Sequence, residues 1–338
     1  MQNLGSFTWF RRIALLATVL ALCVVVLGAY VRLSDAGLGC PDWPGCYGTL
    51  TVPESQSAIT HAQEAYPNKP VEAHKAWKEM AHRYVAGTLG LLVLSLCVLG
   101  WRAKRHISVS PMLPTALLFV IGFQAMLGMW TVTLLLKPVI VSSHLMGGMT
   151  TLAILTWIAH RHFGSASKRV VESDLVRFWI RGALLVIFAQ IFLGGWTSSN
   201  YAALACTDFP TCHGEWMPAD MDFGTAFHWV RELGQTAAGK PLELSAFTAI
   251  QWTHRLGALI TFIYLSTLGV MLIKNERLKS FGVVLLALLF MQISLGIGNL
   301  VLHLPLALAV GHNMGAALLL IIIVVVNSKI TELSKGSY

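Results

Sequence analysis

Residues 79–83 read Glu-Met-Ala-His-Arg and stand where a polar loop enters a long apolar run. The glutamate and the histidine are three residues apart, so a helix would place them on one face. A similar motif occurs at residues 251–255 as Gln-Trp-Thr-His-Arg, with glutamine in place of glutamate. Two more apolar runs open with histidines, His144 and His312. The pattern predicts a chain built from a repeat, with these four histidines at equivalent places.

The composition predicts a membrane protein. The chain has 338 residues, of which 55% are hydrophobic and 12% are charged, whereas soluble domains carry about 25% charged residues. Eight apolar runs approach the length of about 20 residues that a bilayer-spanning helix needs. They cover roughly residues 13–33, 78–100, 112–136, 139–160, 177–198, 249–273, 281–302 and 305–327. We therefore expect an all-α polytopic membrane protein with eight transmembrane helices.

The net charge of +8 is explained by topology. With the amino terminus inside, most basic residues fall in cytoplasmic segments, and most acidic residues fall outside. This positive-inside pattern orients all eight spans, places both termini in the cytoplasm, and needs no nucleic-acid partner. The first run follows two arginines but exceeds a signal-peptide core, so we interpret it as a span. The expected location is a bacterial inner membrane, with multiple passes.

The two halves of the chain align. The pair Gly128 and His144 repeats as Gly296 and His312 with one constant offset, and the motif Gln-x-x-Leu-Gly occurs at 124–128, 190–194 and 292–296. An even number of spans separates the repeats, so they share one orientation. We expect two tandem, pseudo-symmetric four-helix bundles, residues 1–168 and 169–338.

The four histidines predict two haem sites. Each half offers two imidazoles at similar depth, near the outer ends of two helices of one bundle, and haem iron in bundles is commonly held by such pairs. The iron ligands would be His82 with His144, and His254 with His312. Zinc is less favoured because no third or fourth ligand lies nearby at the usual spacing. We expect no ligand role for the other eight histidines: His61, His74, His106, His160, His162, His213, His228 and His303.

Only the first half has a carboxylate beside its histidine. Glu79 can exchange a proton and Gln251 cannot, so we expect chemistry in the first half and a resident redox haem in the second. We expect Glu79 in the first turn of its helix, where the helix dipole favours an anion. The alternative is that it is merely a solvated acid at the start of the helix. Arg83 and Arg255 follow their histidines and could contact haem propionates, or extend to the membrane interface as long basic side chains do.

Two pairs of cysteines lie in outside loops. Cys40 and Cys46 form one pair, and Cys206 and Cys212 form the other. Each pair can close a short disulfide, which an oxidising compartment would permit. We favour structural bonds, with a redox role as the alternative.

The chain resembles the haem A synthase family over nearly its whole length. The resemblance comprises the eight spans in two halves, the motif at Glu79, His82 and Arg83, its glutamine counterpart at His254, and the cysteine pairs. His144 and His312 belong to it as well. It implies oxidation of the C8 methyl group of haem O to the formyl group of haem A, for use in terminal oxidases.

The resemblance also implies roles for individual residues. His254 and His312 would hold a haem b cofactor in the second half. His82 and His144 would bind the haem O substrate in the first half, with Glu79 essential nearby. Implied partners are haem O synthase upstream and a membrane electron acceptor, with homo-oligomerisation left open. The alternatives are a two-haem electron-transfer cytochrome, such as a quinol oxidoreductase, and a haem transporter. The absence of charges at mid-membrane depth disfavours the transporter.

Overall fold

A computed structural model describes residues 2–107, 110–163 and 173–330. This part of the chain contains ten helices and no strand. The helices are α1 Gln2–Leu33, α2 Gln56–Ala65, α3 Ala73–Arg102, α4 Met112–Thr133, α5 Pro138–Phe163, α6 Asp174–Ser199, α7 Phe223–Ala226, α8 Leu244–Ile273, α9 Lys279–Val301 and α10 Leu306–Lys329.

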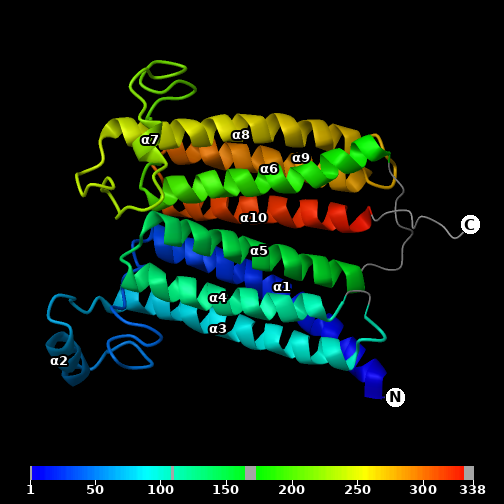
Figure 1. Ribbon diagram of the computed structural model, residues 1–338, viewed down its shortest axis with the longest axis horizontal. Helices are drawn as coiled ribbons and strands as arrows, with labels where there is room; N and C mark the ends of the chain where they lie inside the picture. Colours follow the sequence, from blue (N-terminus) through cyan, green and yellow to red (C-terminus); the bar gives the residue numbers. More distant parts are fainter. Residues whose placement is uncertain (1, 108–109, 164–172, 331–338) are drawn as a thin grey trace, which may run out of the picture.

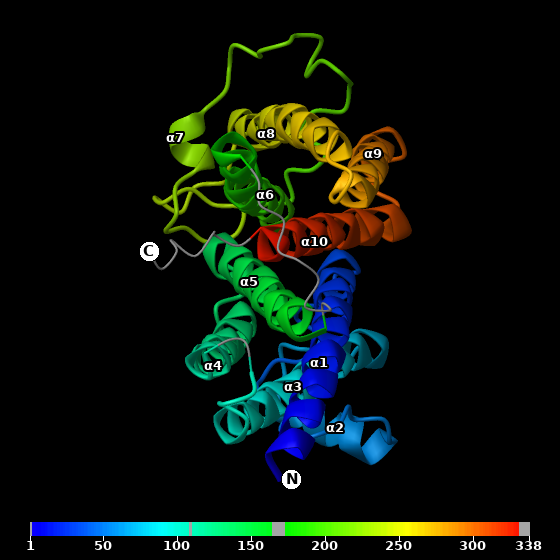
Figure 2. The same cartoon turned by 90° about the vertical axis from the view of Figure 1, so that its right-hand side faces the viewer.

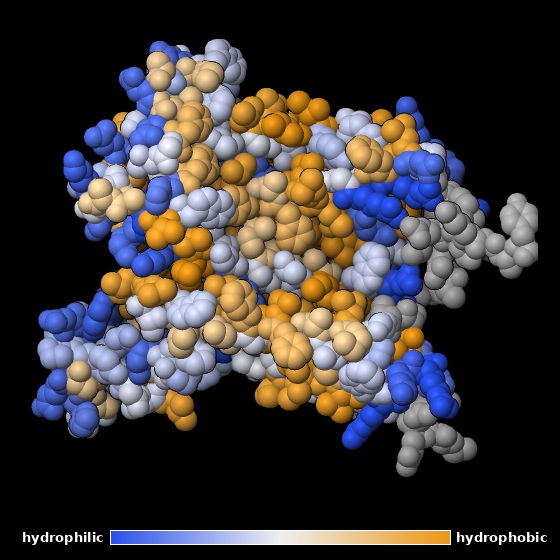
Figure 3. All heavy atoms as spheres, in the orientation of Figure 1, coloured by the Kyte–Doolittle hydropathy of each residue, from blue (hydrophilic) through white to orange (hydrophobic). Residues whose placement is uncertain are grey.

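Eight of the helices, all except α2 and α7, are long and apolar enough to cross a membrane. Figure 3 shows a hydrophobic middle with hydrophilic residues gathered toward both ends of the molecule. The predicted all-α polytopic membrane protein is confirmed.

The helices α3 and α8 begin earlier than the apolar runs indicated. The start of α3 is Ala73 instead of residue 78, and the start of α8 is Leu244 instead of residue 249. These first turns carry polar and small residues that extend the helix beyond its hydrophobic run. Glu79 therefore lies in the second turn of α3, and His82 more than two turns from its start. The expectation of a first-turn anion stabilised by the helix dipole was wrong, because that effect fades beyond the first turn.

The spans pack as two rings of four helices (Figure 2). In the first ring α1 contacts α3 and α5, and α4 contacts the same two helices. In the second ring α6 contacts α8 and α10, and α9 contacts the same two. Within the described residues α3 and α5 make no direct contact, and neither do α8 and α10. The four helices that carry the key histidines therefore form two diagonal pairs.

The two rings share one hydrophobic core. Helix α5 packs against α6 and α10, and α10 packs against α1. Buried side chains from both rings form one continuous cluster, from Phe10 of α1 to Val326 of α10. Polar contacts join the rings near their loop end, where Ser142 meets Ser199 at 3.1 Å and Arg32 donates to Tyr201 at 2.7 Å. The predicted junction of the halves, residues 168 and 169, lies outside the described residues.

Both large loops lie at one end of the molecule. Figure 1 shows α2 and α7 at the end opposite the start of α1. The first loop packs a small apolar cluster, including Tyr47 and Val52, onto the start of α3. The second loop packs its own cluster around Trp196 and the start of α8. Each loop therefore covers the end of a bundle where the histidines lie.

Candidate functional site

Each of the four histidine rings lies against a glycine on the neighbouring helix. A Cβ added at these glycines would come within 2.9 to 3.4 Å of the imidazole Cε1. The contacts are His82 of α3 with Gly28 of α1, His144 of α5 with Gly128 of α4, His254 of α8 with Gly194 of α6, and His312 of α10 with Gly296 of α9. Because glycine has no side chain, each imidazole ring can pack directly against the backbone of the neighbouring helix. The structure thus repeats one local arrangement four times.

The rings form two pairs across the two bundles. His82 and His144 lie on the diagonal helices α3 and α5 of the first bundle, and His254 and His312 lie on α8 and α10 of the second. All four line an extended cavity of about 2330 Å³ whose walls come from both halves. Sites for small molecules usually enclose about 300–1,000 Å³, so there is ample room for a large, flat ligand. Each predicted pair thus lies within one bundle, and its role as a pair of iron ligands stays a prediction.

Two glutamines contact the histidines of the second half. Gln190 of α6 places its amide nitrogen 3.1 Å from His254 Nδ1 and 3.1 Å from the His254 carbonyl oxygen. The backbone carbonyl of Gln292 lies 3.2 Å from His312 Nδ1, and its side-chain amide lies 3.4 Å from the other ring nitrogen. In the first half Nδ1 of His82 and Nδ1 of His144 are buried without a hydrogen bond.

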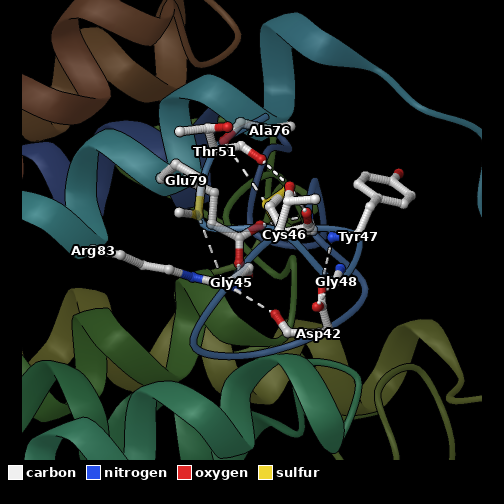
Figure 4. The surroundings of a disulfide bond; sticks show 12 residues. Asp42, Gly45, Cys46, Tyr47, Gly48, Thr51, Ala76, Glu79 and Arg83 are labelled. Atoms are coloured by element: carbon white, nitrogen blue, oxygen red, sulfur yellow. Dashed lines mark hydrogen bonds and ion pairs between the residues drawn. A yellow bond between two sulfur atoms is a disulfide. The ribbon is translucent and has the colours of Figure 1, made fainter. Parts of the chain in front are cut away.

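Glu79 is held in a network at the loop end of α3 (Figure 4). Its Oε2 accepts a hydrogen bond of 3.0 Å from the backbone amide of Cys40, and its Oε1 pairs with Arg83 at 2.5 Å. The residue is only 5% exposed and lines the cavity. The alternative of a solvated acid is therefore wrong: the glutamate is a buried, paired carboxylate.

Gln251 occupies the equivalent place in the second half without the same contacts. It is buried and lines the cavity, and its Oε1 has no hydrogen-bond partner among the described residues. Arg255 donates to the carbonyl of Cys206 at 2.7 Å, a bond that Arg83 does not make to Cys40 in the first half. The glutamate therefore changes how the disulfide loop is attached to the helix.

Both arginines bind the disulfide loops. Arg83 donates to the carbonyl of Asp42 at 3.0 Å and also to that of Gly45. Arg255 donates to the carbonyls of Asp208 at 2.9 Å and Thr211 at 2.7 Å. The guanidinium groups thus tie each loop to the helix that carries the histidine. Contact with a haem propionate stays a prediction.

The cysteines form two disulfides, Cys40–Cys46 and Cys206–Cys212, with S–S distances of 2.05 and 2.00 Å. Inside each loop an aspartate accepts two backbone amide bonds. Asp42 accepts those of Tyr47 and Gly48, and Asp208 those of His213 and Gly214. Asp208 also accepts a hydrogen bond from the Thr211 hydroxyl, which with the two amide bonds lowers the pKa of its carboxyl below the ordinary value. The predicted disulfides are confirmed.

Sequence reasoning did not assign the glycines and the glutamines to the site. The motif Gln-x-x-Leu-Gly was visible three times, but only as a sign of the repeat. Its glycine is the one that receives a histidine ring, and its glutamine lies four residues earlier on the same face. Four residues before Gly28 the chain has Val24 instead of glutamine, so Gly28 does not belong to the motif. The motif therefore does not predict the contact between Gly28 and His82.

A family model described as "Cytochrome oxidase assembly protein" matches residues 11–324. The chain belongs to the cytochrome oxidase assembly protein family. The match runs from the first span into the last, so it includes both bundles, both disulfide loops and all four histidines of the cavity.

Several relatives extend over nearly the same length. The heme A synthase of Shewanella oneidensis is 44% identical over 326 residues, which cover 95% of this chain and 96% of the relative. The heme A synthase of Caulobacter vibrioides is 28% identical, covering 90% of this chain and 91% of that protein. The heme A synthase of Bacillus licheniformis is 25% identical, covering 89% of each. The resemblance to the haem A synthase family is confirmed.

The residues of this family member fit a haem in each half. Nε2 of His82, His144 and His254 makes no hydrogen bond with any described residue, so it can bind a metal when the ring proton is on Nδ1. At His312 the Gln292 amide lies 3.4 Å from Nε2 and would have to turn away for a metal to bind. Within the described ranges no three His, Cys, Asp or Glu side chains gather to hold a bare ion. Two facing imidazoles in a large apolar cavity instead suit a metal whose equatorial ligands come from a macrocycle.

Proposed function

We propose that this protein is a haem A synthase, an oxidoreductase acting on a CH group, which converts the C8 methyl group of haem O to a formyl group. The observation that carries the proposal is the pair of histidine sites in one cavity, of which only the first contains a buried carboxylate. The full-length similarity to heme A synthases supports it.

In this proposal the first half, residues 1–168, binds haem O between His82 and His144. The diagonal placement of α3 and α5 leaves space between these rings. The apolar cavity wall suits the hydrophobic tail and macrocycle of the substrate, because burial of apolar surface drives binding. Arg83 and Arg255 lie near the outer ends of the sites, where propionates would project.

The second half, residues 169–338, holds haem b between His254 and His312. Bound there, haem b supplies one-electron redox chemistry, and Gln251 offers no proton exchange beside it. Gln190 and Gln292 contact its two histidines, which suits a cofactor that stays in place.

Glu79 is the proposed catalytic residue of the first half. Conversion of a methyl group and one water to a formyl group releases four protons and four electrons. Glu79 would accept a proton from water at the methyl carbon, a role in which positioned side chains contribute about 10²–10⁴-fold to the rate. Arg83 and the Cys40 amide hold the carboxylate at the cavity wall while it does so. The electrons pass to a membrane electron acceptor.

The proposed setting is a bacterial inner membrane with both termini in the cytoplasm. The basic residues in the short loops opposite α2 and α7 support this orientation. It places the disulfide loops, and the haem sites beneath them, at the periplasmic side. Haem O synthase is the proposed upstream partner, since it would supply the substrate.

The competing function is a two-haem electron-transfer cytochrome, which the two similar histidine pairs would also suit. Purified protein in detergent should be given haem O and an oxidant, and the extracted haems separated by chromatography. Haem A formed in proportion to added haem O supports the synthase. Two bound haems that undergo redox cycling without any change in the porphyrin would establish the cytochrome instead.

A further inference from the structure

Three of the four histidines share an arrangement that the fourth lacks. Each of the three precedes a glycine by three residues, which places both on one helix face. A Cβ at that glycine would overlap the carboxamide of a glutamine from the neighbouring helix, so the glycine makes room for it. The three pairs are Gln124 with Gly147, Gln190 with Gly257, and Gln292 with Gly315.

His82 has neither member of this pair. Its ring lies against Gly28 as the others lie against their glycines, but Val24 stands where the glutamine would be. Val85 stands three residues after His82, where the others have glycine. Nδ1 of His82 is buried and has no hydrogen-bond partner. No carboxamide is therefore available at this ring from the equivalent position.

The hydrogen bonding of the rings is graded across the molecule. At His254 the carboxamide of Gln190 lies 3.1 Å from Nδ1. At His312 the nearest group to Nδ1 is the main-chain carbonyl of Gln292, at 3.2 Å, and the main chain of Gln124 interacts with His144 in the same way. His82 comes last in this order, with neither a glutamine nor a hydrogen bond at Nδ1.

This grading matters for a metal-bound imidazole. A histidine that binds a metal through one ring nitrogen usually donates its other N–H to a fixed acceptor, which sets the tautomer and the ring orientation. Loss of that acceptor typically lowers metal affinity about 10–100-fold. A carboxamide can act as donor or acceptor, so it can serve the ring with and without the metal.

We propose that Gln190 is the positioning residue that keeps haem permanently in the second half through His254, and that His82 is the imidazole that releases iron in the first half. The absence of a glutamine at His82 then lets the first half exchange its haem, as an enzyme must do with substrate and product. The inference rests on the proposed function, since it assigns the exchanging site to the substrate.

The first test gives His82 the missing pair. The double variant Val24→Gln with Val85→Gly is compared with Val24→Leu with Val85→Gly, which has a similar change of volume but no carboxamide. Purified full-length protein carrying its resident haem is loaded with haemin, and apomyoglobin is added to capture whatever haem dissociates. Release from the first half should be about 10–100-fold slower in the glutamine variant than in the leucine variant. Equal release rates would overturn the role of His82.

The second test removes the one glutamine side chain that contacts Nδ1 of its ring. Gln190→Leu should lose the resident haem to apomyoglobin about 10–100-fold faster than the unmodified protein. It should also shift the low-spin electron paramagnetic resonance signal. Gln124→Leu is the matched control and should leave that signal and that rate unchanged. Gln190→Glu keeps an acceptor for the ring N–H and should restore retention.

Unchanged retention and an unchanged signal in Gln190→Leu would overturn the positioning role, even if the double variant at His82 failed to fold. The result is separable from the proposed function. Haem A made by the unmodified protein would support the synthase whatever the release rates are, whereas its absence would count against the synthase alone.

Discussion

The carboxylate of Glu79 accepts a 3.0 Å hydrogen bond from the backbone amide of Cys40, so the acid of the first cavity is fixed to a disulfide loop. The same carboxylate pairs with Arg83, which also binds the loop carbonyls. The loop, the acid and the helix that carries His82 therefore form one unit. In the second half the arginine binds the loop, and Gln251 leaves its Oε1 unpaired. The replacement of glutamate by glutamine thus also changes how the disulfide loop is attached to its helix.

Glu79→Gln should abolish most haem A formation while leaving the resident haem in place. The glutamine keeps an oxygen for the Cys40 amide, so the loop stays attached, but it cannot take up a proton. We expect a rate about 10²–10⁴-fold lower, the range of a lost acid–base group. Haem composition and turnover of the purified variant provide the measurement. Gln251→Glu is the control and should not speed the reaction; normal haem A output from Glu79→Gln would rule out the proton-transfer role.

Removal of the two disulfides should have unequal effects. Replacing Cys206 and Cys212 with serine should cost about 2 kcal/mol of stability or less, since the closed loop is short, and should leave turnover nearly unchanged. The same change at Cys40 and Cys46 should also lower turnover, because the Cys40 amide holds Glu79. Haem A yield at matched amounts of folded protein separates the two cases. Equal turnover in both variants would contradict the link between loop and acid.

The histidine pairs should differ in what they retain. His254→Ala or His312→Ala should lose the resident haem b, because a single axial imidazole remains. His82→Ala should keep it and lose binding of haem O. Reduced-minus-oxidised absorbance spectra of the purified variants are the measurement. Loss of the resident haem in His82→Ala, with retention in His254→Ala, would reverse the assignment of the halves.

Much of the fold followed from the sequence because membrane helices must satisfy their own backbone and because the chain repeats. The apolar runs predicted every span, and the repeat assigned His82 and His144 to one half and His254 and His312 to the other. Helix starts were less accurate: polar residues after Ala73 continue the helix beyond the apolar run. That shift also removed the dipole argument for Glu79.

The contacts made by side chains were harder to predict. Whether Arg83 binds a propionate, a loop carbonyl or water depends on how the loop folds over the helix, which spacing along the chain does not encode. The glutamines were visible as a motif, but their contact with His254 and His312 arises only when neighbouring helices pack. Gly28 is not part of a recognisable motif, and its contact with His82 becomes visible only when α1 packs against α3.

Asp208 should make its loop sensitive to acid. Its hydrogen bonds hold the carboxyl pKa below the ordinary value of 3.8. A lowered pKa in the folded state means that the stabilisation is fully present above about pH 4 and is lost as the pH falls further. Hydrogen–deuterium exchange, corrected for intrinsic rates, should show falling protection of the Gly214 amide below pH 4. Asp208→Asn should remove this pH dependence; an unchanged profile in that variant would assign it to another group.

Gly296→Ala should disturb the second haem site without unfolding the bundle. An added Cβ would lie 3.0 Å from His312 Cε1, so the ring must move by a few tenths of an ångström. Overpacking of this kind costs about 1–3 kcal/mol, and a loss of 1.4 kcal/mol in binding is a tenfold loss of affinity. We therefore expect weaker retention of the resident haem and a shifted low-spin electron paramagnetic resonance signal. Gly122→Ala is the matched control, since a Cβ there meets nothing within 4 Å. If both variants gave the unmodified spectrum, the glycine would be serving helix packing and not the position of the imidazole.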